Sequence, residues 1–133
     1  MRSSIPSILL AMTVLASCDS EEGRVTGTWQ GSRFETDVWT LTIDDSHGRL
    51  SGTYRIQWDE EPSEVSGSLT GSSLATTRDF LDVWIEFNVE IAAGTATCRY
   101  NARLRDEVVL SGETVCVRDA REFQVGHLGL RRQ

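Results

Sequence analysis

The chain has 133 residues, of which 39% are hydrophobic and 25% charged, a composition typical of a globular protein. This length suits one domain better than two. The formal net charge is −7, and no run of three cationic residues occurs. The sequence therefore lacks the basic stripe that nucleic-acid binding requires, and no nucleic-acid partner is expected.

The N-terminus has the features of an export signal. Arg2 places a positive charge ahead of an apolar run over residues 5–16. The run is shorter than the roughly 20 residues that cross a bilayer, and Pro6 interrupts it. The sequence therefore predicts a signal peptide over residues 1–17 that is removed after export. An uncleaved anchor is one alternative.

The residues at the end of this run, Leu15-Ala16-Ser17-Cys18, resemble the [LV]-x-[SAG]-C lipobox of bacterial lipoproteins. The resemblance implies a diacylglycerol on the Cys18 sulfur, cleavage before Cys18 and an acylated amine. Plain secretion is the other alternative, but export signals without lipid prefer a small residue where Leu15 stands. The expected location is the bacterial cell envelope, with a membrane as partner through the lipid; inner and outer membrane stay open.

Residues 18–23 are polar and acidic after the cysteine, and they are predicted to form a short lipidated tether. A single domain is expected over residues 24–133. With Cys18 assigned to the lipid, Cys98 and Cys116 remain as a pair in an oxidising compartment, where a disulfide is the default. The histidines lack the short ligand spacing of a zinc site, so no metal and no cofactor are expected.

Polar and apolar residues alternate with a period of two from Val25 onward, which indicates β-strands. The strands expected in the first half span residues 24–32, 38–44, 49–58, 64–70 and 72–78. A hairpin loop is expected at residues 44–48, with Gly48 in a left-handed conformation, and an exposed acidic loop at residues 59–64.

In the second half, the expected strands span residues 82–91, 95–104, 108–118 and 123–131. A turn of helix is considered around residues 119–122. The inward residues are odd-numbered on the strand over residues 82–91 and even-numbered on the strand that follows. The numbers of two directly paired residues must therefore add up to an odd number. Such a register brings Arg99 beside Glu86 or Glu90. Cys98 and Cys116 both face inward on neighbouring strands, either directly opposite or diagonal.

Eight or nine short strands joined by short turns predict an all-β fold. The simplest arrangement is an antiparallel up-and-down (meander) β-barrel of about eight strands, because closure removes the exposed sheet edges. A β-sandwich is the alternative, which the lack of long crossovers disfavours.

A barrel of this size either fills itself with side chains or holds one small ligand. Its predicted inward residues include bulky aromatic side chains, which favour packing, and several glycines, which leave space or relieve tight corners. If a ligand binds, we expect the mouth of the barrel to hold a small apolar or aromatic molecule. The side chains expected to contact it are Trp29, Trp39, Tyr54 and Trp58.

Three short stretches resemble the avidin-like barrel: Gly27-Thr28-Trp29, the strand Leu50-Ser51-Gly52-Thr53-Tyr54, and Val125-Gly126-His127. Lipocalin-like barrels also begin with a G-x-W strand. The resemblance implies that Tyr54 stands where the avidin-like family binds the ureido oxygen of biotin. Gly31, Ile56 and Leu128 replace the polar residues of that family's ligand cage, so the resemblance implies architecture and not biotin binding.

No enzymatic activity is expected. The chain has no G-x-S-x-G motif, and its two histidines stand far apart in the sequence, at His47 and His127. Two functions of other classes stay open: a structural or interaction module that contacts another envelope protein, and a lipocalin-like binder of a small ligand. For the first, the predicted outward Trp84 is the expected contact residue, because exposed Trp is a frequent hot spot.

Overall fold

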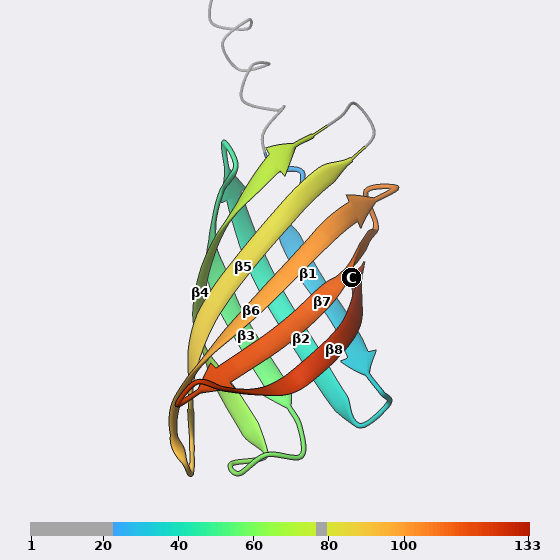
Figure 1. Cartoon of the computed structure of the whole chain (residues 1–133). Helices are drawn as coiled ribbons and strands as arrows, with labels where there is room; N and C mark the ends of the chain where they lie inside the picture. Colours follow the sequence, from blue (N-terminus) through green and yellow to red (C-terminus); the bar gives the residue numbers. More distant parts are fainter. Residues whose placement is uncertain (1–22, 77–79) are drawn as a thin grey trace, which may run out of the picture.

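The chain folds into a closed barrel of eight antiparallel strands that follow one another around the wall in chain order (Figure 1). This computed structural model describes residues 23–76 and 80–133. The predicted meander barrel is confirmed, and the β-sandwich is excluded. The predicted signal peptide, Cys18 and most of the tether lie outside the described residues.

The strands are long for a chain of this size. In order they are β1 (Gly27–Arg33), β2 (Asp37–Ser46), β3 (Arg49–Gln57), β4 (Glu64–Ala75), β5 (Leu81–Ile91), β6 (Gly94–Arg105), β7 (Val109–Arg118) and β8 (Arg121–Arg132). Turns of two residues join β2 to β3, β5 to β6 and β7 to β8. The two short strands predicted over residues 64–70 and 72–78 are one continuous strand, β4, so the wall has eight strands and not nine.

The helical turn considered around residues 119–122 is wrong. Asp119 and Ala120 form a hairpin turn with positive φ angles of 51° and 62°, and β8 begins directly after them. Two-residue turns with both φ angles positive match the right-handed twist of the strands that they join. His47 and Gly48 have the same signs at the β2–β3 turn, as predicted for Gly48.

The core occupies the whole interior of the barrel. Alternate residues of every strand point inward, and the predicted alternation is clearest in β3, where Leu50, Tyr54 and Ile56 are buried. Trp29, Trp39 and Tyr100 are among the largest side chains that are fully buried, together with a ring of Leu and Ile residues. Full burial of each Leu or Ile side chain contributes about 1.5–3 kcal/mol.

Four inward glycines, Gly31, Gly52, Gly71 and Gly112, allow neighbouring strands to approach closely. A Cβ atom at Gly31 would lie 1.9 Å from the carbonyl oxygen of Gly129, and one at Gly112 would lie 1.9 Å from that of Asn101. No side chain fits at such a distance. These glycines therefore allow the strands to coil tightly around the barrel. They relieve tight corners, which is the second of the two roles considered for them.

The barrel closes where β1 meets β8. The register pairs Trp29 with Arg132 and Gln30 with Arg131. The Arg132 guanidinium lies 4.3 Å from the centroid of the Trp29 ring, and its Nε donates to the Glu107 carbonyl oxygen over 2.9 Å. One arginine therefore links the closing strands to the β6–β7 turn.

The registers of β5, β6 and β7 agree with the sequence analysis. Glu86 pairs with Arg99, and the carboxylate accepts a hydrogen bond from the guanidinium over 3.0 Å. Cys98 lies directly opposite Cys116, and the two sulfur atoms are 2.05 Å apart, at the distance of a disulfide bond.

Candidate functional site

The four aromatic residues predicted to contact a ligand are part of the packed interior. Trp39 packs edge-on against Trp58, with ring centroids 6.3 Å apart, and Tyr54 stacks on Phe87 at 4.1 Å. Trp29 lies apart from this group, and its ring packs against the Arg132 guanidinium where β1 meets β8. All four are at least 95% buried. Of the four, Tyr54 borders a cavity, so the small-ligand hypothesis stays a prediction that depends on this residue.

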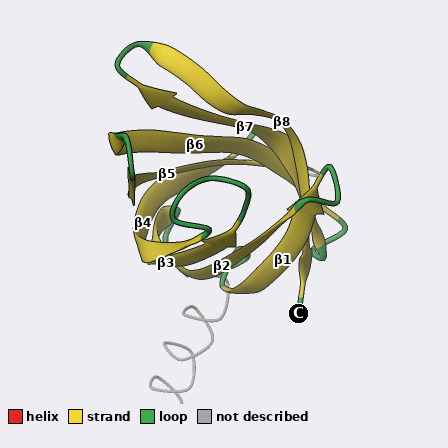
Figure 2. Ribbon diagram, turned by 90° about the horizontal axis from the view of Figure 1, so that it is seen from below, coloured by secondary structure: helices red, strands yellow, loops and turns green. Residues whose placement is uncertain are grey.

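The lower end of the barrel, where the β1–β2, β3–β4, β5–β6 and β7–β8 connections lie, is covered by the β3–β4 loop. Figure 2 looks along the barrel from this end and shows a loop across the opening. Trp58 donates from its indole nitrogen to the Pro62 carbonyl oxygen over 3.1 Å, and Ala92 donates to the Glu61 carbonyl oxygen over 2.6 Å. The stretch predicted as an exposed acidic loop is therefore partly bound to the barrel.

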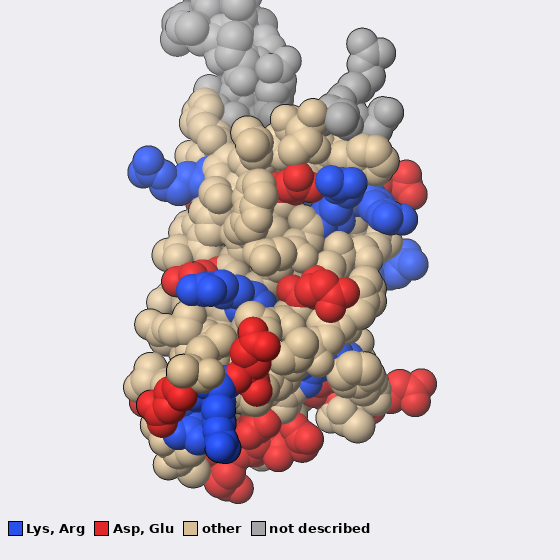
Figure 3. Space-filling view, in the orientation of Figure 1, with Lys and Arg blue, Asp and Glu red and all other residues tan. Residues whose placement is uncertain are grey.

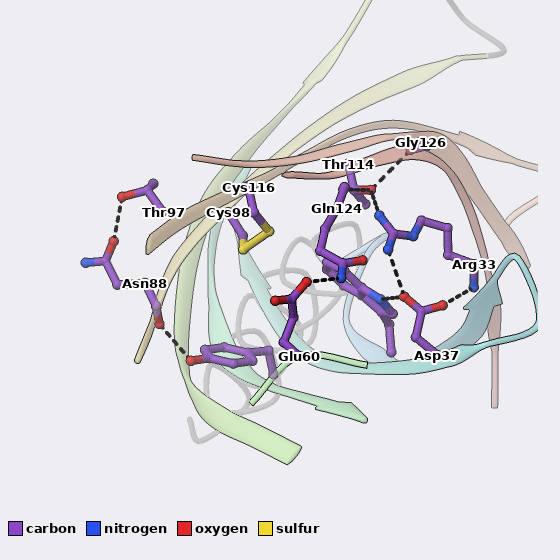
Figure 4. The surroundings of a disulfide bond; sticks show 12 residues. Arg33, Asp37, Glu60, Asn88, Thr97, Cys98, Thr114, Cys116, Gln124 and Gly126 are labelled. Carbon is purple, nitrogen blue, oxygen red and sulfur yellow. Dashed lines mark hydrogen bonds and ion pairs between the residues drawn. A yellow bond between two sulfur atoms is a disulfide. The ribbon is translucent and has the colours of Figure 1, made fainter. Parts of the chain in front are cut away.

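A buried ion pair lies inside the barrel next to this loop (Figure 4). Arg33 and Asp37 are 5% and 3% exposed, and the Arg33 Nη2 is 3.3 Å from the Asp37 Oδ2. The same carboxylate accepts from the Arg33 backbone and from the Trp39 indole nitrogen, each over 2.8 Å. It thus satisfies three donors that water does not reach.

Gln124 connects the barrel wall to the covering loop. Its Nε2 donates to the Asp59 Oδ1 over 2.9 Å and to the Glu60 Oε2 over 2.6 Å. The side chain has the same parity as the inward Leu128 and Leu130. At this point β8 carries one extra residue opposite the stretch between Thr114 and Cys116, and Gln124 has a φ of 51°. Such a β-bulge redirects side chains next to it. The sequence analysis missed this contact, because alternation assigns a side chain to one face of the sheet and does not say which loop it reaches.

A lateral opening separates the lower halves of β4 and β5. The two strands pair from Thr70 and Glu86 up to Ala75 and Leu81, and below these pairs they diverge. A cavity of about 620 Å³ lies between residues 64–69 and residues 87–91. We call it the β4–β5 slot. It is lined by Tyr54 and Phe87, by small polar residues of β4, and by the carboxylates of Glu64, Glu86 and Glu90.

Tyr54 crosses beneath β4 to reach the far side of the slot. Its ring lies under Gly67, where a Cβ atom would be 3.0 Å from the ring, and its hydroxyl donates to the Asn88 carbonyl oxygen over 2.7 Å. Burial and the nearby Glu90 carboxylate raise the pKa of Tyr54, so its hydroxyl stays a donor. The contact occupies a backbone group that a neighbouring strand would otherwise bind.

We expect Tyr54→Phe to lower the free energy of unfolding by about 1 kcal/mol, the usual net contribution of one hydrogen bond. Tyr100→Phe is the matched comparison, because its hydroxyl donates to the Leu128 carbonyl oxygen over 2.8 Å inside the core. The latter loss should be larger, since water cannot replace the lost donor there. Urea unfolding of both variants measures the difference; equal losses would contradict this interpretation.

Trp84 lies on the outer face of β5, as predicted, with 40% of its surface exposed. Its paired neighbours are Ser72 of β4 and Asn101 of β6, and Asp82 and Glu86 point outward on either side of it along β5. Two shallow hollows of about 400 and 280 Å³ flank the indole. An aromatic side chain within a polar rim is the arrangement found at protein interfaces.

The chain matches no protein-family model, no curated protein and no solved structure. Within residues 23–76 and 80–133, no group of three or more His, Cys, Asp or Glu side chains is placed to hold a metal ion. In the same residues, no helix has the length and apolar character that crossing a membrane requires.

The charges on the barrel surface are unevenly distributed. Figure 3 shows several carboxylates gathered toward the lower end, interleaved with fewer basic groups. Arg55 donates to Glu64 over 3.1 Å, and this hydrogen bond and charge hold the pKa of the Glu64 carboxyl below its usual range. Glu64 is therefore ionised at neutral pH, and the slot has a negative rim.

Proposed function

We propose that this protein is a membrane-anchored lipoprotein of the bacterial envelope that acts as an interaction module. The lipobox-like residues 15–18 support the anchor. The observation that carries the interaction is Trp84, an exposed indole between two hollows on the outside of a barrel whose inside is filled. A filled barrel presents its outer face and its loops to a partner.

The expected partner surface is the face around Trp84, bounded by Asp82, Glu86, Arg99 and Asn101. Two ion pairs keep this rim ordered: Arg99 with Glu86 over 3.0 Å, and Arg103 with Asp82 over 2.9 Å. Exposed pairs contribute only about 0.2–1 kcal/mol each to folding, so their role here is to border the aromatic contact. The partner is expected to be another envelope protein.

Trp84→Ala should weaken binding to the partner by about 2 kcal/mol, roughly thirtyfold in Kd, if the indole is the central contact. The partner is captured by photo-cross-linking in native membranes from a probe placed next to Trp84, then purified and titrated. Val125→Ala is the control, because Val125 is also an exposed apolar residue, on β8. A partner that binds Trp84→Ala as tightly as the unmodified chain would overturn the proposal.

A further inference from the structure

The β4–β5 slot exposes two strand edges within an otherwise closed wall. β3 pairs with β4 down to Glu64, and β6 pairs with β5 down to Ile91. Residues 64–69 and 87–91 are therefore each paired on one side, and within the described chain no strand pairs with their other side. The lower part of the wall thus has two free edges that face each other across the cavity.

A free edge is a template for another strand. Along a strand, about every second residue directs its N–H and C=O toward the same neighbour, so residues 64–69 present about three such residues to the slot. On the β5 side, Tyr54 already occupies the Asn88 carbonyl oxygen. The β4 edge is therefore the one that can accept a strand, and its small residues Ser66, Gly67 and Ser68 leave room above it.

The charge of the slot selects the kind of strand. Of the residues that line it, three are carboxylates and none is cationic. Arg55 and Arg99 contact Glu64 and Glu86 from neighbouring strands, whereas Glu90 accepts a hydrogen bond from the Thr95 hydroxyl over 2.7 Å. A second copy of this barrel would bring the same carboxylates to the same edge, which like-charge repulsion disfavours.

We infer that the β4–β5 slot binds an extended segment of a partner protein that carries Lys or Arg side chains and pairs with the free edge of β4. The inference rests on the proposed function and adds the chemistry of the partner. Backbone hydrogen bonds to residues 64–69 supply affinity, as in other cases of strand addition, and Glu90 selects positive charge. The slot and the hollow beside Trp84 share Thr70 and Glu86, so one partner can occupy both.

The test uses the full chain with Cys18→Ser and a nine-residue amidated peptide of alternating Lys and Thr. A peptide of alternating Glu and Thr is the control. We expect the Lys peptide to bind at least about tenfold more tightly at low salt, with the difference shrinking as salt is added. Amide hydrogen exchange at residues 64–69 should slow when it binds. Equal binding of both peptides, or protection elsewhere in the barrel, would overturn the inference.

Charge reversal tests the selectivity at one side chain. Glu90→Lys should weaken the Lys peptide by about tenfold, while Glu113→Lys, an equal change on the exposed face of β7, should leave it unchanged. If both weaken binding equally, the attraction is only that of the net charge, and the slot is not the site.

The slot and the proposed function fail in different ways. If Trp84→Ala abolishes partner binding but the peptide leaves residues 64–69 unprotected, the slot inference is wrong and the interaction module stands. If the peptide protects residues 64–69 but the native partner binds Trp84→Ala as tightly as the unmodified chain, the slot inference stands and the proposed Trp84 interface is wrong.

Discussion

Asp37→Ala is expected to lower the free energy of unfolding by about 3–5 kcal/mol, the cost of breaking a buried ion pair by removing one partner. The substitution leaves the Arg33 guanidinium without its counter-charge in a site that is 95% buried. It also leaves the Arg33 backbone amide and the Trp39 indole nitrogen without an acceptor. Domains of this size have a free energy of unfolding of about 5–15 kcal/mol, so the substitution should remove a large share of it.

The measurement is equilibrium unfolding in urea, followed by Trp fluorescence and circular dichroism. Glu86→Ala is the control, because Glu86 pairs with Arg99 over 3.0 Å but its side chain is 55% exposed. That variant should lower stability by less than about 1 kcal/mol. The double variant Arg33→Met with Asp37→Leu should recover part of the loss, because no charge is then buried alone while the Arg33 amide and the Trp39 indole nitrogen still lack an acceptor. A loss below about 1 kcal/mol for Asp37→Ala would contradict the buried-pair interpretation.

Replacing both Cys98 and Cys116 by Ala is expected to cost about 3 kcal/mol, the value that the loop-entropy model gives for a bridge between residues 18 apart. Both cysteines are fully buried on neighbouring strands. The bridge ties β6 to β7 beside the bulge of β8, where the strand pairing is interrupted. Its loss should therefore speed amide exchange in the lower halves of β7 and β8 first.

Treatment with a reductant distinguishes the stability contributed by the disulfide bond from that contributed by the packing of its sulfur atoms. In the Cys18→Ser background, dithiothreitol should lower the stability of the unmodified pair toward that of the Ala variant and should leave the Ala variant unchanged. Two reactive thiols in the denatured, unreduced chain would contradict the bridge. Protection of both thiols until reduction is the expected result.

The period-two pattern predicted much of this barrel because one face of each strand is buried. The same alternation also predicts the orientation of two charged residues that the sequence analysis did not discuss. Trp29 and Gly31 place Arg33 on the inward side, and Trp39 and Leu41 place Asp37 there. A charged residue at an inward position predicts a partner of opposite charge, so the buried pair was within reach of the sequence.

The remaining parts of the site depend on where alternation stops. Gln124 has the same parity as the inward Leu128 and Leu130, but the bulge of β8 also places Phe123 opposite Cys116, and no residue type in this stretch indicates an extra position. The β4–β5 slot was equally hidden, because the sequence of Glu64 to Ala75 is that of a paired strand throughout. Whether a strand finds a neighbour depends on twist and on the length of the connections, which are properties of the closed barrel.

The close contacts at Gly31 and Gly112 bear on how such a barrel diverges over evolutionary time. Core residues tolerate exchange when volume and pattern are kept, since many combinations of Leu, Ile, Val and Phe fill one interior. A position at which a carbonyl oxygen lies 1.9 Å from a missing Cβ accepts no such exchange. Distant relatives can therefore differ in most of the core and retain these glycines at the same strand positions, so their spacing is the signature by which to recognise them.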